Sequence, residues 1–493
     1  MKKWILLTWS VLILFTSCEK GEYKSVIPEN ARMVMSVDLA KLASDADLAN
    51  SAAVDMLKKT IGLVATGSAK RKVNAFIENP NNLGFDLRES AYLFQTPNEC
   101  YGLALKVDDK GDVDDLFKFL SKQGLCSKPT EKDGRMWGAL LGDIQFAYDS
   151  GTFLLLLPTK GEGKEMVKQM MAQYFSLDKE KQFLESEQFE KIEAEKGAIR
   201  LFSKANALPT AAESFIQNML PKTVRTGDVE MRSSFQFENG KMTMSTKLFS
   251  DNPTVQKLMD EADKKMHTVH GKYVNGAEGS FLWSTVGCNG EWLLSVLKQN
   301  ETMKKYLLMV ERAVDIEKML KAVDGDVTFL LRSKEPVFDG KFSLMAMAEV
   351  QREDFLADVA DWQTAMRDYH IAMQKVGTNQ YRISADDYEL NWGVVNGNLY
   401  FASDNSFDTK LMEQASNAAV PSYLNEMEGT KMFTYIDLTK LSLSDFDVAG
   451  IAVKNPLNRL EGLVVKSNKI GEFEFQLVGK DKSQPLLRSL LAK

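Results

Sequence analysis

One succession of local patterns occurs twice in this chain, and it constrains the fold more than any other feature. In residues 102–157 an apolar run is followed by an acid-started amphipathic segment, then by alternating apolar residues that turn at 150–151. Residues 343–403 repeat this succession and turn at 396–397. Ser-Gly or Asn-Gly between alternating segments indicates a hairpin, and an apolar period near 3.6 residues indicates a helix. Both stretches are therefore predicted to form a strand, a helix and a hairpin, in that order.

Segments outside these two stretches repeat in the same order. The first half has apolar alternating runs followed by a hairpin pattern, and the second half has counterparts, namely 91–94 with 327–331, 199–203 with 431–437, and 230–248 with 463–477. A spacing of roughly half the chain is far longer than the 20–50 residues of solenoid repeats. The pattern therefore predicts large duplicated domains.

The predicted fold class is α+β, with two tandem, internally duplicated domains. Each domain is expected to be an antiparallel-rich sheet with packed helices, because every strand-to-strand link inside a repeat is a hairpin or a helical connection. We place the first repeat at 27–265 and the second at 274–493, joined by a linker at 266–273.

The N-terminus has the pattern of a secretory signal. Two lysines precede an apolar run at 4–15, which spans only about 18 Å as a helix, whereas a bilayer core is roughly 30 Å thick. We therefore predict a cleaved signal peptide over 1–17. The sequence Phe-Thr-Ser-Cys ending at Cys18 resembles a bacterial lipobox, in which Cys18 becomes the lipid-modified first residue; the alternative is an ordinary signal peptide with an incidental cysteine. Residues 18–26 then form a polar tether.

Charge and cysteine content restrict the function classes. The formal net charge is −7 and no basic stripe is present, which argues against nucleic-acid binding. In an exported protein Cys100 and Cys126 could form a disulfide. The odd count, with Cys288 as the third cysteine of the mature chain, favours buried free thiols instead.

Three groups of polar residues could carry chemistry. His267 and His270 would share a helical face if the preceding helix continued, giving half of a metal site, but no third ligand stands at a reinforcing spacing. The acidic run at 108–115 suits calcium in composition, yet it lacks the EF-hand order and its position favours capping of a helix. Asp143 and Asp386 lie in matched hairpin regions and could contribute to an acid–base pair, although surface turns are the simpler interpretation.

No nucleophile elbow, phosphate-binding loop or dinucleotide fingerprint occurs in the sequence. We therefore predict no catalytic residue, no metal and no cofactor. The tryptophans could stack on sugars, but their positions on alternating strands favour the core. Two function classes remain: a non-catalytic binding or scaffold protein for a polymer or a protein ligand, and an envelope hydrolase acting on glycan or peptide through an acid pair.

Several segments together resemble a known family. They are the lipobox at Cys18, the Ile-Pro-Glu at 27–29 before Met-Val-Met-Ser-Val-Asp-Leu at 33–39, and the similar Phe-Thr-Tyr-Ile-Asp-Leu at 433–438. These resemble a family of large Bacteroidetes lipoproteins that carry a domain of unknown function. The resemblance implies export, lipid anchoring in the membrane and placement in the cell envelope, with the outer membrane favoured. It supplies no activity, cofactor or site residue.

Overall fold

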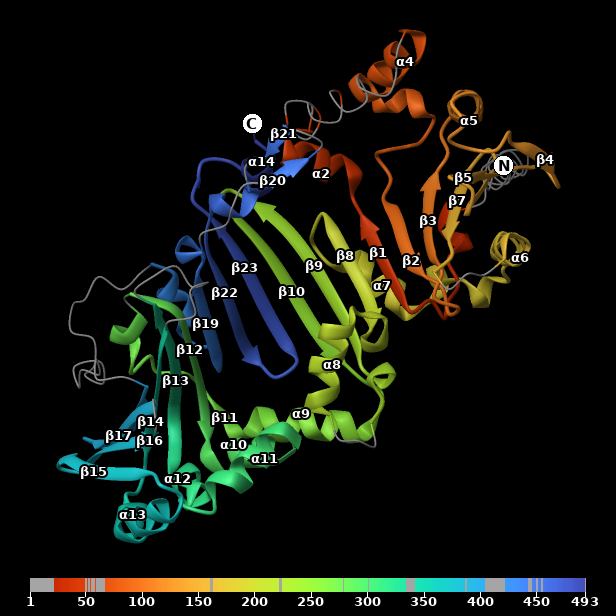
Figure 1. Ribbon diagram of the computed structural model, residues 1–493. Helices are drawn as coiled ribbons and strands as arrows, with labels where there is room; N and C mark the ends of the chain where they lie inside the picture. Colours follow the sequence, from red (N-terminus) through yellow and green to blue (C-terminus); the bar gives the residue numbers. More distant parts are fainter. Residues whose placement is uncertain are drawn as a thin grey trace, which may run out of the picture. The chain divides into compact units, whose positions relative to one another are not determined.

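The computed structural model (Figure 1) divides into two compact units. The first contains the described residues up to Ala207, with 234–236 and 491–492; the second contains Leu208–Ser233 and Phe237–Leu490. The structure describes residues 22–48, 51, 54, 58, 67–159, 163–220, 224–277, 279–299, 301–333, 342–385, 388–403, 422–441, 446–448, 451–453 and 455–492.

The first unit is built on an antiparallel sheet. Its strands pair in the order β8 (Ile199–Lys204), β1 (Met33–Val37), β2 (Ala91–Gln95), β3 (Tyr101–Lys106), β7 (Thr152–Leu157), β6 (Ile144–Tyr148), β5 (Arg135–Leu140) and β4 (Thr130–Lys132). Its helices are α2 (Leu39–Ala46), α4 (Gly67–Glu78), α5 (Lys110–Lys122), α6 (Lys164–Tyr174) and α7 (Glu187–Ala194), with short 3-10 turns η1 (Tyr23–Val26), η3 (Pro80–Leu83), η4 (Lys179–Lys181), η5 (Phe183–Glu185) and η6 (Ala205–Ala207).

Helix α5 shows how the acidic run is used. The Asp109 carboxylate accepts the backbone N–H groups of Gly111 and Asp112 at 2.7 and 3.1 Å, which satisfies donors that a helix start leaves unpaired. About two turns further on, α5 buries Phe117, which stacks on Phe146 of β6 with ring centroids 4.1 Å apart. The capping interpretation of this run is therefore confirmed.

The second unit contains a longer antiparallel sheet. Its strands pair in the order β9 (Glu230–Glu238), β10 (Lys241–Phe249), β23 (Glu472–Gly479), β22 (Leu460–Lys469), β19 (Met432–Asp437), β12 (Ser280–Asn289), β13 (Val323–Ser333), β14 (Phe342–Val350), β18 (Asn398–Ala402), β17 (Tyr388–Val395), β16 (Gln380–Ala385) and β15 (Ala372–Gly377). The short β11 (Met266–His267) pairs with the end of β12, and β20 (Phe446–Val448) pairs with β21 (Ile451–Val453).

Helices of the second unit connect these strands. They are α8 (Thr210–Met219), α9 (Pro253–Lys265), α10 (Gly290–Gln299), α11 (Glu301–Val310), α12 (Ile316–Lys321), α13 (Val359–Asp368) and α14 (Leu486–Leu491), with 3-10 turns η7 (Thr226–Asp228), η8 (Val274–Ala277), η10 (Asp354–Asp358), η12 (Ser422–Met427), η13 (Leu438–Lys440) and η14 (Pro456–Arg459).

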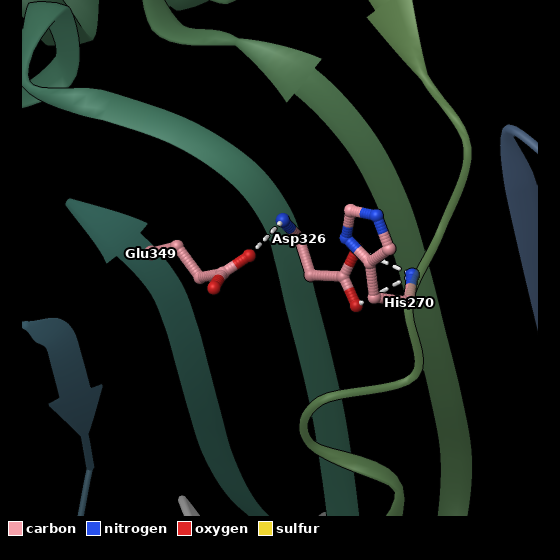
Figure 2. A group of neighbouring side chains, drawn as sticks. All are labelled: His270, Asp326 and Glu349. Atoms are coloured by element: carbon pink, nitrogen blue, oxygen red, sulfur yellow. Dashed lines mark hydrogen bonds and ion pairs between the residues drawn. The ribbon is translucent and has the colours of Figure 1, made fainter. Parts of the chain in front are cut away.

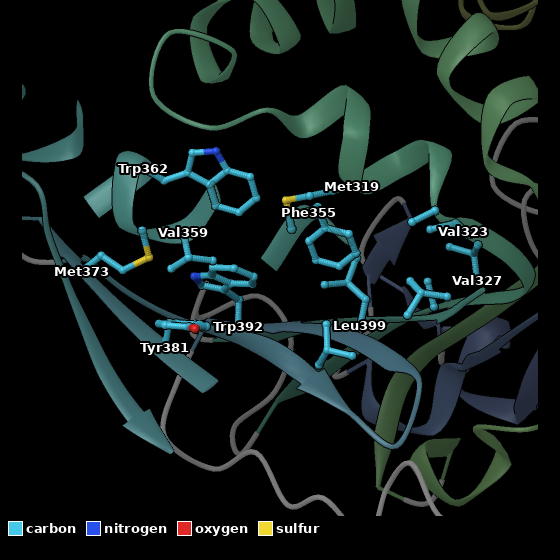
Figure 3. Packing of buried hydrophobic residues seen from close by; sticks show 14 of the residues in the cluster. Met319, Val323, Val327, Phe355, Val359, Trp362, Met373, Tyr381, Trp392 and Leu399 are labelled. Atoms are coloured by element: carbon cyan, nitrogen blue, oxygen red, sulfur yellow. The ribbon is translucent and has the colours of Figure 1, made fainter. Parts of the chain in front are cut away.

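The second unit has a core on each face of its sheet. On one face, α13 and its neighbours pack over an aromatic cluster in which Tyr381 stacks on Trp392 at 4.8 Å and Trp362 lies 5.9 Å from Trp392 (Figure 3). On the other face, Trp283 lies 6.0 Å from Phe433, beneath η8 and η12. These three tryptophans are at most 5% exposed, so the predicted burial in the core is confirmed for them. Two others to which the same prediction applied, Trp137 and Trp292, are only partly buried.

The two sheets share a run of eight strands in one order. The run from β8 to β4 in the first unit and the run from β19 to β15 in the second place their strands side by side in the same order relative to the chain. In both runs a helix follows the fourth strand, α5 after β3 and α13 after β14. The predicted α+β class is confirmed. The predicted domain bounds stay a prediction: the β9–β10 hairpin, which the sequence pattern assigns to the first repeat, joins β23 through β10 and lies mostly in the second compact unit.

Candidate functional site

A group of titratable side chains lies at the end of β13 in the second unit. Asp326 of β13 is completely buried, Glu349 extends from β14, and His270 belongs to the segment between β11 and η8 (Figure 2). One potential ligand atom from each residue lies within 4.8 Å of the other two. This is the arrangement in the described chain that most resembles a metal or acid–base site.

Hydrogen bonds already engage the carboxylates of this group. Asp326 accepts the backbone N–H of His270 at 3.0 and 3.2 Å and that of Lys272 at 3.1 Å. The pairing of β13 with β14 is irregular between Val323 and Val327. Within this irregular stretch, the Asp326 N–H donates to the Glu349 carboxylate at 3.1 Å. The Lys272 ammonium lies 2.6 Å from the other oxygen of Glu349.

This geometry supports a structural role for the group. A buried carboxylate is stable when several N–H donors satisfy it, and here the donors come from the segment that the carboxylate holds against the sheet. A divalent cation would have to displace Lys272 from Glu349. The His270 ring is 71% exposed and its Nδ1 lies 3.9 Å from Asp326, too far for a hydrogen bond. We call this arrangement the Asp326 clamp.

The two predicted histidines do not share a helical face. Helix α9 ends at Lys265, and the chain then enters β11, so the premise of a continued helix is wrong. His267 Nε2 lies 2.9 Å from Asp324, whereas the backbone of His270 binds Asp326. The spacing of the histidines had suggested that both contribute to one metal half-site. In the structure, each histidine interacts with a different aspartate.

The other predicted residues are dispersed. Asp143 lies in an exposed turn, with Lys164 at 3.7 Å, and Asp386 lies outside the described residues. Cys18 and residues 1–17 also lie outside them. Cys100, Cys126 and Cys288 are buried thiols that are not joined in a disulfide, as the odd count had favoured.

A second feature of this unit is an apolar sheet face. Seven adjacent strands, from β14 through β13, β12, β19, β22 and β23 to β10, place two rows of directly paired residues on one side of the sheet. The first row is Leu344, Leu331, Leu282, Ile436, Leu463, Leu477 and Met242; the second is Ala346, Phe329, Ser284, Thr434, Val465, Phe475 and Met244. None of these fourteen side chains is buried. We call these two rows the open face.

The opposite side of the same strands is covered. Leu330, Trp283 and Val464 are at most 1% exposed, whereas Phe329 and Leu344 on the open face are 44% and 47% exposed. An antiparallel sheet with one packed face ordinarily carries polar residues on its other face. A contiguous apolar surface of this kind is typical of a binding site.

The polar groups within the open face satisfy each other. Ser284 and Thr434 are direct cross-strand partners, and their hydroxyl oxygens lie 2.7 Å apart. The other twelve residues are aliphatic, aromatic or methionine, so the two rows contain no charged side chain. The surface therefore offers hydrophobic contact and almost no hydrogen-bonding capacity.

The first unit has a smaller surface of the same type. Leu93 on β2, Tyr101 on β3 and Leu157 on β7 are 39–43% exposed. Leu93 pairs directly with Leu103 and Met35, which lie on the same side of the sheet. This is the side on which α5 packs, just as α13 packs on the open-face side of the second sheet.

The fold and these surfaces define an α+β protein with a large antiparallel sheet and an accessible apolar face. The chain belongs to the family defined by a domain of unknown function, DUF4836, whose model matches residues 23–450. This agrees with the domain of unknown function that the sequence resemblance implied.

Solved structures with local similarity include crystal forms of TP0453. Form IV has 13% identity and a TM-score of 0.28, covering 48% of this chain and 83% of that chain. Form I has 12% identity and a TM-score of 0.28, covering 50% and 86%. No curated protein matches the sequence. Within the described residues, no helix combines the length and apolar character needed to cross a membrane.

Proposed function

We propose that the protein is a lipid-anchored protein of the cell envelope that acts by binding a ligand, without a catalytic step. The anchor is Cys18, exposed as the first residue once the signal peptide at 1–17 is removed. The basic, apolar and Thr-Ser-Cys succession of the N-terminus supports this part. The family resemblance favours the outer membrane as the location.

The observation that carries the binding role is the open face. Hydrophobic burial contributes about 25 cal/mol per Å² of apolar surface removed from water, so fourteen accessible side chains without a charge favour association. The most site-like titratable group, in contrast, is engaged in the Asp326 clamp. Binding is therefore the role that the described residues support better than hydrolysis.

We further propose that the chain contains two copies of one α+β plan, close to residues 27–265 and 274–493. The shared order of eight strands supports this proposal, as does the matching position of α5 and α13. Accessible apolar residues also occur on corresponding strands, with Leu93 on β2 and Phe329 on β13. A duplicated plan would supply two related surfaces for one extended ligand or for two ligands.

Replacement of Cys18 tests the anchor. Cys18→Ser is expected to abolish metabolic labelling with radioactive palmitate and to release the protein into the soluble fraction. The matched control, Lys20→Ala, changes the same tether and is expected to leave labelling and membrane fractionation intact. Membrane partitioning of an unlabelled Cys18→Ser protein would contradict this anchor.

A separate experiment tests binding against hydrolysis. The mature protein is incubated with polysaccharides, peptidoglycan and peptides, and both turnover and affinity are measured. Saturable binding without turnover agrees with the proposal. Turnover that disappears in Asp143→Asn, while that variant keeps the circular dichroism spectrum of the parent, would establish the hydrolase instead.

A further inference from the structure

We infer that the open face binds the acyl chain of a single lipid molecule. This inference rests on the binding role proposed above and assigns its ligand class. The first row crosses seven strands without a polar interruption, from Leu344 on β14 to Met242 on β10. The chemistry of this surface, its length and its twist each restrict the occupant.

The polarity of the open face selects hydrocarbon. Protein interfaces ordinarily form about one hydrogen bond per 100–200 Å² and have a polar rim. Here the central hydroxyls of Ser284 and Thr434 bond to each other and leave little for a partner. Their shared bond uses one of the two hydroxyl hydrogens, so the uncharged rows offer a ligand a single hydroxyl donor at most. Such a surface complements a ligand that has neither charges nor hydrogen-bonding groups, as in an alkyl chain.

Strand addition by a peptide is excluded at the centre of the face. Each inner strand already has a neighbour on both sides; β12, for example, pairs with β13 and β19. Their backbone groups are committed to these ladders, so a peptide could not gain affinity through main-chain hydrogen bonds there. A ligand at the centre of the face can therefore bind only through contact with the side chains of the two rows.

The dimensions of the face suit one acyl chain. Six inter-strand steps of about 4.8 Å give the row a length of roughly 29 Å. An acyl chain extends about 15 Å, half of a bilayer core that is roughly 30 Å thick. The face therefore has room for the full length of one chain, or for two chains end to end.

Twist distinguishes a single lipid from a membrane surface. Neighbouring strands rotate by about 20–25° on average, and the strands between β10 and β14 change direction visibly in Figure 1. A planar bilayer cannot follow such a surface over seven strands, whereas a flexible chain can.

Helices also limit the face along one of its long edges. The next row of the same side, which includes Val327 and Val286, packs into the core with Met319 of α12. An acyl chain that lies along the two rows is therefore expected to have these helices along one side.

The test uses the mature chain from residue 18 with Cys18→Ala, so that its own lipid cannot occupy the face. The probe is cis-parinaric acid, a fatty acid that becomes fluorescent in an apolar environment, with oleate as competitor. The wild-type face is expected to give saturable fluorescence that oleate displaces. Leu463→Asp places a carboxylate in the middle of the first row and is expected to weaken binding at least ten-fold, equivalent to about 1.4 kcal/mol.

Two further variants make the result decisive. Asn468→Asp adds the same charge to the same strand at an exposed position outside the two rows, and is expected to bind like the parent protein. Phe329→Asp changes a side chain that is already 44% exposed, so it disturbs folding less. It serves as the second test if circular dichroism shows that Leu463→Asp is unfolded.

Several outcomes would overturn the inference. These are absence of parinaric acid binding by the folded parent, binding by the folded open-face variants that is as tight as that of the parent, and association only with phosphatidylethanolamine–phosphatidylglycerol vesicles in flotation. A glycan or protein ligand found without fatty-acid binding would overturn the acyl assignment and keep the proposed binding role. The Cys18 labelling experiment is independent of all of these outcomes.

Discussion

Removal of the Asp326 side chain tests whether the clamp is structural. In Asp326→Ala, the backbone N–H groups of His270 and Lys272 lose their acceptor, and the N–H of residue 326 keeps its bond to Glu349. Leaving a buried donor unsatisfied costs about 1–3 kcal/mol. Two donors at a site that is partly accessible to water give an expected loss of about 2–4 kcal/mol.

The loss is measured at the clamp itself. Because the chain has two compact units, a single global unfolding free energy is not well defined, and amide hydrogen exchange gives the local value. The amides of His270 and Lys272 are expected to exchange about 30- to 1000-fold faster in Asp326→Ala, corresponding to that free-energy loss. Asp326→Asn retains one carbonyl acceptor and is expected to show a smaller effect.

A matched control is available two residues away. Asp324 is 42% exposed and pairs with His267 at 2.9 Å. Asp324→Ala should change protection at 270 and 272 by less than about 0.5 kcal/mol, as for other surface positions. Unchanged exchange in Asp326→Ala, or an equal effect of Asp324→Ala, would refute the clamp.

Three further outcomes are expected. Hydrogen bonding from Arg88 lowers the pKa of Asp86 from 3.8 to about 2. The stability that the ionised carboxylate contributes is therefore present above pH 3.8 and lost as the pH falls toward about 2. In Asp86→Asn, stability followed by circular dichroism should depend less on pH in that window. Phe117→Ala removes the ring stacked on Phe146 and should destabilise the first unit by about 3–5 kcal/mol in urea unfolding, and a loss below 1 kcal/mol would contradict this packing. Burial raises the pKa of Cys288 to about 12, so a disulfide reagent should modify this thiol in urea and leave it unmodified in the native protein, as peptide mapping would determine.

Local features of the fold could be predicted from the sequence. The turn at Asn396-Gly397 is a hairpin with positive φ at both residues, as an Asn-Gly pair predicts. Capping of α5 by the acidic run was also predictable, because a cap and its donors lie within three residues. Such signals depend on neighbours in the chain.

The sites depend on distant partners, and the sequence could not predict them. The Asp326 clamp joins residues more than fifty positions apart in the chain, through an irregular strand pairing. The open face could not be predicted from the sequence for a different reason. Alternation in each strand, such as Phe329 and Leu331, indicates a face toward the core, and only the assembled register shows that nothing buries these rows within the described chain.

The pairing of β10 with β23 has a consequence for biosynthesis. Lys241 faces Val478, so the edge of β10 receives its partner only when β23, more than two hundred residues later, has been made. Until then β10 presents unpaired backbone groups, which invite association with other chains. Pairing over such a separation is also slow, because a long loop must close before the contact forms. A nascent chain therefore exposes this edge of β10 until β23 is made, and a stop codon just before β23 would leave the edge exposed permanently.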